Sequence, residues 1–222
     1  MKVMVMGDVH GWWTDMMKLI EIQKPDVVLQ VGDFGYFPRH PDYTPQTRGV
    51  KSPVPLHWCD GNHEDHDALA ALRKSFGGER TAHEVAPNVF WQDRGTTTTL
   101  PDGRAVLFFG GADSIDKRLR IEGESWFPGE QINDEDMIAL PDGNIDIIVS
   151  HTCPNRIIID AVNYPDALVH DPTRERLDEV FERYRQKHWY FGHWHMPMRG
   201  EVDGCQYLGL NDLSGRGCFA WL

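Results

Sequence analysis

Residues 2–11 read KVMVMGDVHG, a short apolar run that passes directly into a loop with ionisable side chains. The run Lys2 to Met6 predicts a buried strand, and the loop after it carries Asp8 and His10. In the next segment, Thr14 to Gln23, apolar residues recur at the spacing of one helical face, with an N-cap expected in the first two residues. The opening therefore predicts a strand, a loop and a helix.

The same pattern recurs along the chain. Four further apolar runs each predict a strand, and each ends in a loop with Asp, Asn or His. Strands that alternate with predicted helices, here at about 67–75 and 173–186, are typical of a largely parallel sheet with helical crossovers. The five units are Lys2 to Met6 with Asp8 and His10, Asp26 to Val31 with Asp33, Val54 to Cys59 with Asn62 and His63, Ile145 to Ser150 with His151, and His188 to Phe191 with His193 and His195.

The middle and the end of the sequence differ from this alternation. Strand-like runs between residues 88 and 109 predict antiparallel pairing, with a turn where Pro, Asp and Gly follow one another. Residues 199–222 hold three more strand candidates, which are typical of a closing β meander. Two long loops, at residues 34–53 and 110–131, are long enough for a functional role that the sequence leaves open.

Length and charge limit the class of protein. The 222 residues suffice for one substantial core, so we expect a single domain over residues 1–222. The formal net charge of −12 argues against long nucleic acid as a partner, because duplex binding needs Lys and Arg to neutralise phosphates. A small anionic substrate stays possible, since bound dications can reverse the field of a site. The sequence carries no signal of oligomeric state.

Apolar runs and cysteines indicate the cellular setting. No apolar stretch approaches the roughly 18 residues of a membrane span, and Met1 to Met4 lead straight into a motif, so neither an anchor nor a signal peptide is expected. The cysteines form no CxxC pair, which favours reduced, buried thiols. These features predict a cytoplasmic protein with no membrane partner. The cysteines are Cys59, Cys153, Cys205 and Cys218.

Potential metal ligands follow all five of the predicted strands. Because ligands bind outside the carboxyl ends of strands in α/β sheets, these loops are expected to converge on one site. Imidazoles, carboxylates and an amide oxygen suit borderline divalent ions such as Mn, Fe, Zn or Ni, whereas Mg²⁺ and Ca²⁺ favour sites with fewer histidines. One carboxylate can bridge two ions that lie roughly 3.5–4 Å apart. The pattern therefore predicts a metal site that can hold two ions.

The polar loops form five motifs in a fixed order. They are Gly7-Asp8-Val9-His10-Gly11, Gly32-Asp33, Gly61-Asn62-His63-Glu64, Ser150-His151 and Gly192-His193-Trp194-His195. In this order they resemble the calcineurin-like metallophosphoesterase family, over residues 7–195. The resemblance implies an α/β fold, a four-layer αββα sandwich of mixed sheets with helical outer layers. It also implies a hydrolase of phosphodiesters or phosphomonoesters that depends on two divalent metal ions.

The resemblance also implies a division of roles. Asp8, His10, Asp33 and His195 would surround one ion, and Asp33, Asn62, His151 and His193 the other, with Asp33 shared. A hydroxide that bridges the two ions would be the nucleophile. His63 matches a histidine that binds no metal, contacts the phosphate and protonates the leaving oxygen, and the alternative is that it orients its neighbours.

One motif departs from the protein Ser/Thr phosphatases of the family. In those phosphatases the second motif has a form like Gly-Asp-x-Val-Asp-Arg-Gly, whereas this chain has Gly32-Asp33-Phe34-Gly35-Tyr36. Because the second Asp and the Arg are missing, the resemblance favours the small bacterial and phage phosphoesterases over protein phosphatases. A nucleotide-directed phosphodiesterase or nuclease of the same fold and a non-catalytic scaffold are the alternatives.

Several charged residues beside the motifs have two interpretations. Arg118 and Arg120 could hold a substrate phosphate through paired N–H groups, or they could be solvated charges of a long loop. Glu64, Asp65 and His66 are expected to form a capping and solvated cluster at the start of the next helix rather than to bind metal.

Overall fold

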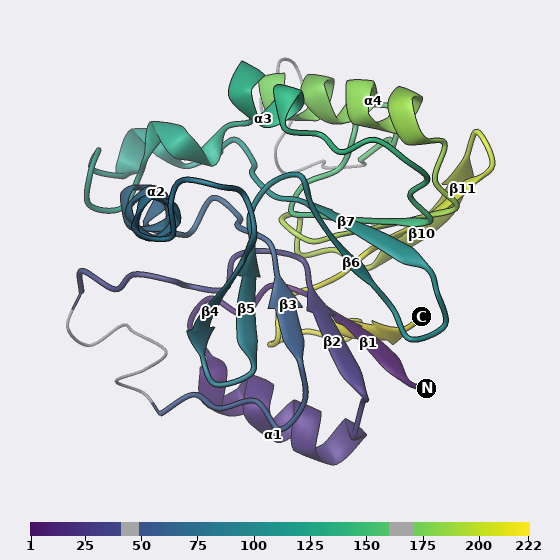
Figure 1. The fold of residues 1–222 in the computed structure, drawn as a ribbon, viewed down its shortest axis with the longest axis horizontal. Helices are drawn as coiled ribbons and strands as arrows, with labels where there is room; N and C mark the ends of the chain where they lie inside the picture. Colours follow the sequence, from purple (N-terminus) through teal and green to yellow (C-terminus); the bar gives the residue numbers. More distant parts are fainter. Residues whose placement is uncertain (41–48, 160–170) are drawn as a thin grey trace.

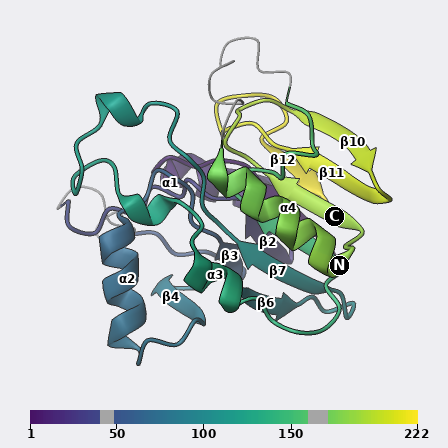
Figure 2. The same cartoon turned by 90° about the horizontal axis from the view of Figure 1, so that it is seen from above.

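Two six-stranded sheets stack between helices in the computed structural model, which describes residues 1–40, 49–159 and 171–222. Helix α1 (Trp13–Gln23) lies below the first sheet in Figure 1, and α4 (Pro172–Tyr184) lies above the second. Helices α2 (His66–Ser75) and α3 (Asp134–Ile138) extend the two outer layers, and Figure 2 shows α3 and α4 from above. The four-layer αββα sandwich expected from the sequence is confirmed.

Both sheets follow the same plan, in which four parallel strands lie between two antiparallel edge strands. The first sheet has the order β12-β1-β2-β3-β5-β4, and the second has the order β10-β11-β9-β8-β7-β6. The first consists of β12 (Phe219–Trp221), β1 (Val3–Met6), β2 (Val27–Gln30), β3 (Leu56–Trp58), β5 (Val89–Gln92) and β4 (Ala82–Ala86). The second consists of β10 (Met198–Val202), β11 (Cys205–Gly209), β9 (His188–Phe191), β8 (Ile147–Ser150), β7 (Ala105–Phe109) and β6 (Thr96–Thr99).

The alternation of side chains along the strands creates three apolar layers. In β1, Val3 and Val5 face the space between the sheets, whereas Met4 and Met6 pack with α1. In β8, Ile147 and Ile148 divide in the same way between the central layer and the layer under α4. Strands buried on both faces read as continuous apolar runs, which is why the sequence reveals them so clearly.

The end of the chain departs from the predicted meander. Strands β10 and β11 pair as a hairpin, but β11 runs parallel to β9, and β12 crosses to the first sheet. There it pairs antiparallel with β1, with Met4 opposite Trp221, so the two ends of the chain lie close together (Figure 1). This pairing covers an edge of β1 that would otherwise be open. The meander prediction is therefore wrong because the choice of sheet depends on which edge is free.

Other local expectations were also incomplete. Strand β4 was not predicted, because its buried positions include the polar His83 and a bulge interrupts its register after Glu84. Helix α1 begins at Trp13, and no side chain caps it, so the predicted N-cap is wrong. The loop at 110–131 contains two short 3-10 helices, η1 (Lys117–Leu119) and η2 (Pro128–Glu130). Within the loop at 34–53, residues 41–48 lie outside the described residues.

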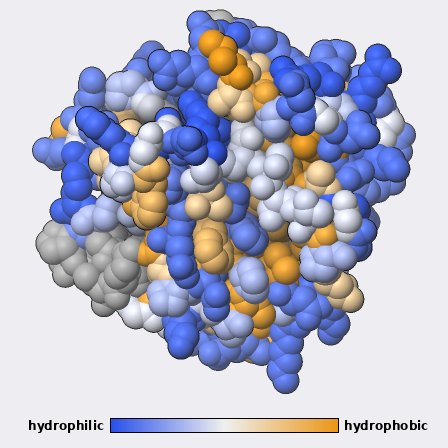
Figure 3. All heavy atoms as spheres, viewed as in Figure 1, coloured by the Kyte–Doolittle hydropathy of each residue, from blue (hydrophilic) through white to orange (hydrophobic). Residues whose placement is uncertain are grey.

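The surface agrees with the acidic composition. Hydrophilic residues dominate the face drawn in Figure 3, and hydrophobic residues show between them in smaller patches. In the described ranges, no helix combines the length and the apolar character needed to cross a bilayer. All four cysteines are unpaired, and three of them are buried while Cys218 is half-buried.

Candidate metal centre

The predicted ligands meet at the carboxyl ends of parallel strands from both sheets. Asp8, Asp33 and Asn62 follow β1, β2 and β3 of the first sheet. His151 follows β8 of the second sheet, and the loop after β9 carries His193 and His195. All seven candidate ligands, with His10 from the loop after β1, are thus brought to one place between the sheets.

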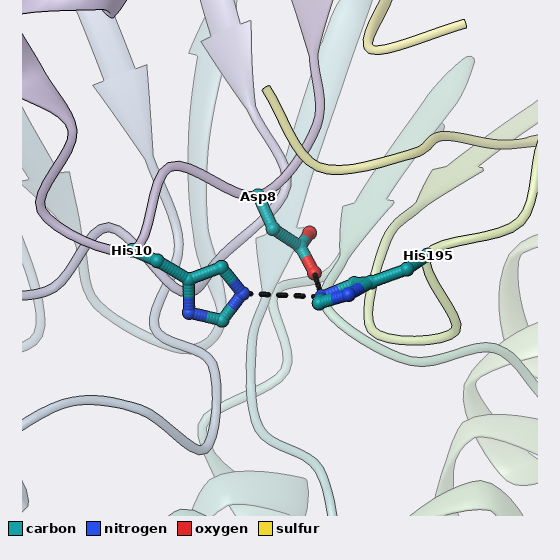
Figure 4. A group of neighbouring side chains, drawn as sticks. All are labelled: Asp8, His10 and His195. Carbon is teal, nitrogen blue, oxygen red and sulfur yellow. Dashed lines mark hydrogen bonds and ion pairs between the residues drawn. The ribbon is translucent and has the colours of Figure 1, made fainter. Parts of the chain in front are cut away.

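One group of donor atoms forms around Asp8, His10 and His195. His195 Nε2 lies 3.1 Å from Asp8 Oδ2 and 3.1 Å from His10 Nε2. Figure 4 shows the two rings pointing toward each other beside the carboxylate. His10 Nε2 also lies 3.7 Å from Asp33 Oδ2. One donor atom from each of Asp8, His10 and His195 falls within 4.8 Å of the others, so this group can hold a metal ion.

A second group forms around Asn62, His151 and His193. Asn62 Oδ1 lies 3.1 Å from His151 Nε2 and 3.0 Å from His193 Nδ1. Asp33 Oδ1 lies 3.2 Å from His151 Nε2, so the two oxygens of Asp33 face different groups. One donor atom from each of Asp8, Asp33 and His151 also lies within 4.8 Å of the others. The same holds for His10, Asp33 and His63.

Unusual backbone conformations concentrate in the motif loops. Among the described residues, eight other than glycine have positive φ, and four of these are candidate ligands. Side chains with a Cβ adopt this left-handed region at a cost, and such strain collects at functional sites. The packing of the loops therefore enforces the conformation of the ligands. The four are His10 (49°), Asp33 (51°), His193 (66°) and His195 (48°).

Two motif glycines make room for the carboxylates. A Cβ on Gly61 would overlap Asp33 Oδ1, and a Cβ on Gly192 would overlap Asp8 Oδ1. Only glycine lets the backbone approach the carboxylates this closely. The glycines of the third and fifth motifs are therefore part of the site geometry.

Burial and charge together shift the pKa values of the cluster. Burial would raise the pKa of Asp33, but the neighbouring histidines, His151 first, outweigh it and hold the pKa well below its usual value. Burial would lower the pKa of His151, but Asp33 and Asp8 raise it to about 10. Burial, with the charge of His151, holds the pKa of His193 well below its usual value. The metal-free cluster is therefore one buried network of opposite charges.

Two observations show that these residues fit a metal ion. Asp8 Oδ1 is buried and has no hydrogen-bond partner among the described residues, which is costly for a carboxylate oxygen. His151 Nδ1 donates to the carbonyl of Val31 at 2.9 Å, and this contact fixes the ring so that Nε2 faces Asp33 and Asn62. An outer hydrogen bond of this kind orients histidines that bind metals.

His63 lies beside both donor groups. Its backbone N–H donates to Asp33 Oδ1 at 2.7 Å, and its ring centroid lies 5.0 Å from that of His10. Burial lowers the pKa of His63, and the positive charge of Arg120 lowers it further. His63 therefore lies against Asp33 and His10 on one side and a permanent positive charge on the other.

The two arginines of the long loop have different environments. Arg120 Nη2 contacts the ring of His63, at 3.1 Å from Nδ1, and Arg120 Nη1 donates to the carbonyl of Asn62 at 3.2 Å. An ion pair of 2.8 Å with Asp116 holds its guanidinium in place. Arg118 is exposed and forms no ion pair or hydrogen bond with any described residue. The fold thus brings Arg120 to the site but not Arg118.

Two residues that support the ligands were not predicted from the sequence. Glu64, Asp65 and His66 are all buried, so the expectation of a solvated cluster is wrong, although Asp65 does cap α2 as expected. Glu64 accepts the backbone N–H groups of Gly35 and Gly61, and burial raises its pKa to about 8. It thereby ties the second motif loop to the third. Its place at the end of the third motif gave no signal of burial.

Asp212 is a second residue that the sequence did not reveal. Its Oδ2 lies 3.4 Å from His195 Nδ1, on the far side of the ring from Asp8. The following residue, Leu213, donates its backbone N–H to the carbonyl of Asp8 at 3.1 Å. The loop before β12 therefore reaches the first group, although it carries none of the five motifs.

A cavity of about 430 Å³ opens onto the cluster. The imidazoles of His63, His193 and His195 line its floor, with Asp33 and Asn62. Its remaining walls come from Trp194 and from the loop at 110–131. A small substrate can therefore reach both donor groups from one side.

Comparisons with known proteins show which family the sequence matches. The family model described as calcineurin-like phosphoesterase matches residues 1–197. This range holds all five motifs, all seven candidate ligands and His63, whereas Asp212 lies beyond it. Among curated protein sequences, none matches the chain.

Solved structures share the fold at low sequence identity. TT1561 of Thermus thermophilus is 14% identical with a TM-score of 0.59, over 96% of this chain and 90% of that chain. The phosphopantetheinyl hydrolase of Mycobacterium tuberculosis is 15% identical with a TM-score of 0.54, over 100% and 95%. GAP50, described as the anchor in the inner membrane complex of Plasmodium, is 11% identical with a TM-score of 0.53, over 96% and 72%. These likenesses show the fold alone.

Proposed function

This chain belongs to the calcineurin-like phosphoesterase family, and from that premise we propose that it hydrolyses small phosphodiesters or phosphomonoesters with two divalent metal ions. The observation that carries the proposal is the position of Asp33. One of its oxygens lies 3.7 Å from His10 in the first donor group, and the other lies 3.2 Å from His151 in the second. A carboxylate shared in this way is the bridging ligand that a pair of ions needs.

The two donor groups divide the ligands between two ions. Asp8, His10 and His195 would hold one ion, Asn62, His151 and His193 the other, and Asp33 both. Bound dications supply Lewis acidity toward the phosphate and lower the pKa of a water molecule toward neutrality. The mixture of imidazole, carboxylate and amide donors favours Mn, Fe, Zn or Ni.

His63 and Arg120 are proposed to act on the substrate next to the ions. Arg120 supplies a permanent positive charge in contact with His63, which lines the cavity, and this charge attracts a phosphate bound there. His63 donates a proton to the leaving oxygen as general acid. The negative charge of the bound phosphate favours the protonated ring and thereby offsets the neighbouring guanidinium.

The shape and charge of the molecule support a small substrate. The cavity of about 430 Å³ suits a single small ester, and the net charge of −12 disfavours long nucleic acid. The motif after β2 lacks the Asp and Arg of protein phosphatases, which disfavours phosphoprotein substrates. Short or cyclic nucleotides stay within the proposed class.

A scaffold without catalysis is the second candidate, because GAP50 is described as an anchor and shares this fold. Against this role stands the full set of seven converging donors, since a scaffold does not require strained ligand loops. Metal content separates the two candidates. A catalytic centre predicts close to two ions per chain after loading, and a scaffold predicts a folded protein with less than one.

The experiment for the proposed function is turnover by the metal-loaded protein. The protein is loaded in turn with Mn²⁺, Ni²⁺, Fe²⁺ and Zn²⁺ and assayed on bis-p-nitrophenyl phosphate and p-nitrophenyl phosphate. We expect release of p-nitrophenol with at least one ion and none after chelation. If no ion supports turnover of either ester or of a nucleotide panel, the proposed function is wrong.

A further inference from the structure

Exposed apolar side chains concentrate in one short segment of the loop at 110–131. Ile115, Leu119 and Ile121 are 48%, 88% and 60% exposed, and all three fall within seven residues of sequence. Exposing large apolar side chains in water is unfavourable, so a local concentration of them marks a surface that binds something. The exposed apolar side chains of this segment therefore indicate that it binds an apolar group.

Two of these side chains line the cavity over the donor groups. Ile115 and Leu119 form part of its wall, and His63 and His193 lie in the same cavity. A group that fills the cavity therefore touches both the imidazoles and the two aliphatic side chains. We call Ile115 and Leu119 the apolar shelf.

Hydrogen bonds on both sides hold the apolar shelf in place. Before it, Asn62 Nδ2 donates to Ser114 Oγ at 3.1 Å, and Ser114 Oγ in turn donates to Glu130 at 2.7 Å. After it, Arg120 donates to the carbonyl of Asn62 at 3.2 Å. Both anchors reach Asn62, so the apolar shelf has a fixed position relative to the second donor group.

The charges around the apolar shelf balance one another. Asp116 pairs with Arg120 at 2.8 Å, and the Lys117 ammonium lies 3.8 Å from the centre of the Trp126 ring. Among the described residues that line the cavity, Asp116 and Asp33 are the only ones with a permanent charge, and both are acidic. The walls therefore offer little to a second phosphate group or to any further anion.

We propose that the substrate is a phosphoester with an uncharged apolar organic group, alkyl or aryl, that lies on the apolar shelf while its phosphate lies at the donor groups. The proposal rests on the proposed function and names the substrate class within it. It excludes nucleoside polyphosphates and sugar phosphates as preferred substrates, because their second group is charged or strongly hydrated.

The experiment measures binding of non-hydrolysable n-alkylphosphonates, from methyl to hexyl, to the metal-loaded protein by calorimetry. A fully buried methylene contributes roughly four-fold in affinity, and an open surface that covers half of it contributes about two-fold. We therefore expect affinity to rise about thirty-fold from methyl- to hexylphosphonate. Leu119→Ser and Ile115→Ser should each reduce this ratio several-fold.

The control is Ile138→Ser, because Ile138 is 84% exposed on α3 and does not line the cavity. This variant should keep the full ratio. Equal affinity for methyl- and hexylphosphonate, or a ratio that Leu119→Ser leaves unchanged, overturns the inference.

Turnover of bis-p-nitrophenyl phosphate is measured on the same preparation. Turnover without any dependence on chain length contradicts the apolar shelf alone. Dependence on chain length without turnover contradicts the proposed function alone.

Discussion

The two donor groups share Asp33 but differ in how they meet solvent. In the first group, the side chains of His10 and His195 are 25% and 42% exposed. In the second, His151 is fully buried, Asn62 is 3% exposed and only His193 is half-buried, while Asp8 of the first group is itself fully buried. The difference comes from position, because His151 ends a central strand whereas His10 and His195 stand on loops at the rim. The second group, which we call the buried half, thus lies mostly in the core, whereas the two histidines of the first group, the exposed half, stand at its edge.

This contrast shows that some ligands of one site can be buried while others stay accessible to a substrate. The buried half resists displacement because its ligands cannot move without disturbing the sheets. The exposed half leaves room for a substrate to approach. The following predictions test whether the two halves behave differently.

The largest effect is expected from Asp33→Asn, because this change removes the charge that both halves share. An amide has one oxygen and cannot face both groups with an anionic donor. Turnover of bis-p-nitrophenyl phosphate should fall by roughly three orders of magnitude, in the range found when a preorganised charge is removed. Metal content should fall below two ions per chain. Asp142→Asn, at an exposed carboxylate that pairs with Arg183, is the control and should keep full activity.

The next prediction compares how much a ligand from each half contributes to the unfolding free energy of the metal-free protein. Removing one partner of a buried charge pair costs about 3 kcal/mol, so His151→Gln should lower the unfolding free energy by about that amount at pH 6. At the more exposed ring, His195→Gln should cost less than about 1 kcal/mol. Denaturant unfolding with a chelator present measures both. Equal losses would contradict the contrast between the halves.

The unfolding free energy lost in His151→Gln should depend on pH in one direction. The pKa of His151 is raised to about 10 in the folded chain, against 6.5 when unfolded. The stability it contributes is complete below about pH 6.5 and is lost as the pH rises toward 10, by at most about 1.4 kcal/mol per unit. The difference between wild type and His151→Gln should therefore shrink between pH 6 and pH 9. A constant difference would show that the lost contact is not electrostatic.

A smaller effect is expected at Asp212, which supports the exposed half. Its carboxylate lies 3.4 Å from His195 Nδ1, and loss of such an outer partner typically costs 10–100-fold in metal affinity or activity. Asp212→Asn should weaken binding of one ion in a metal titration and leave the other ion unchanged. Asp212→Glu should restore part of the affinity. Equal weakening of both ions would place Asp212 in general packing instead.

The smallest effects come from the arginines of the long loop. Arg120→Ala should lower kcat/KM for phosphoesters about ten-fold, because it removes a positive charge near the cavity and a contact to His63. Arg118→Ala should stay within about two-fold, since that side chain is exposed and has no partner in the described part of the chain. A strong effect of Arg118→Ala would mean that the loop closes over the substrate.

Much of the centre was predictable because each of its parts is a local signal. An apolar run followed by Asp, Asn or His predicts both a buried strand and a ligand at its end. Five such signals in order indicated seven donors, and the family resemblance that they carry implied the sandwich. The parallel strands of each sheet were predictable for the same reason, since a strand buried on both faces must be apolar throughout.

The edge strands and the residues that support the ligands depend on contacts between distant segments. Strand β4 carries the polar His83 at a buried position, and β12 pairs with whichever edge is free, so neither position follows from its own sequence. Glu64 was expected to be solvated because a carboxylate usually is. Only the neighbouring loops, which place two N–H donors against it, make its burial possible. That residues 1–222 form one domain stays a prediction.

The sequence by itself determined which residues could bind metal, because ligand chemistry belongs to the side chain and the strand before each ligand is a local pattern. The tertiary structure alone decided how these ligands divide into a buried and an exposed half. It also decided that Asp33 faces both halves, that Asp212 and Arg120 support them, and that an apolar shelf stands over them. These properties depend on distances between segments that are far apart in the chain, and only the packing of two sheets fixes such distances.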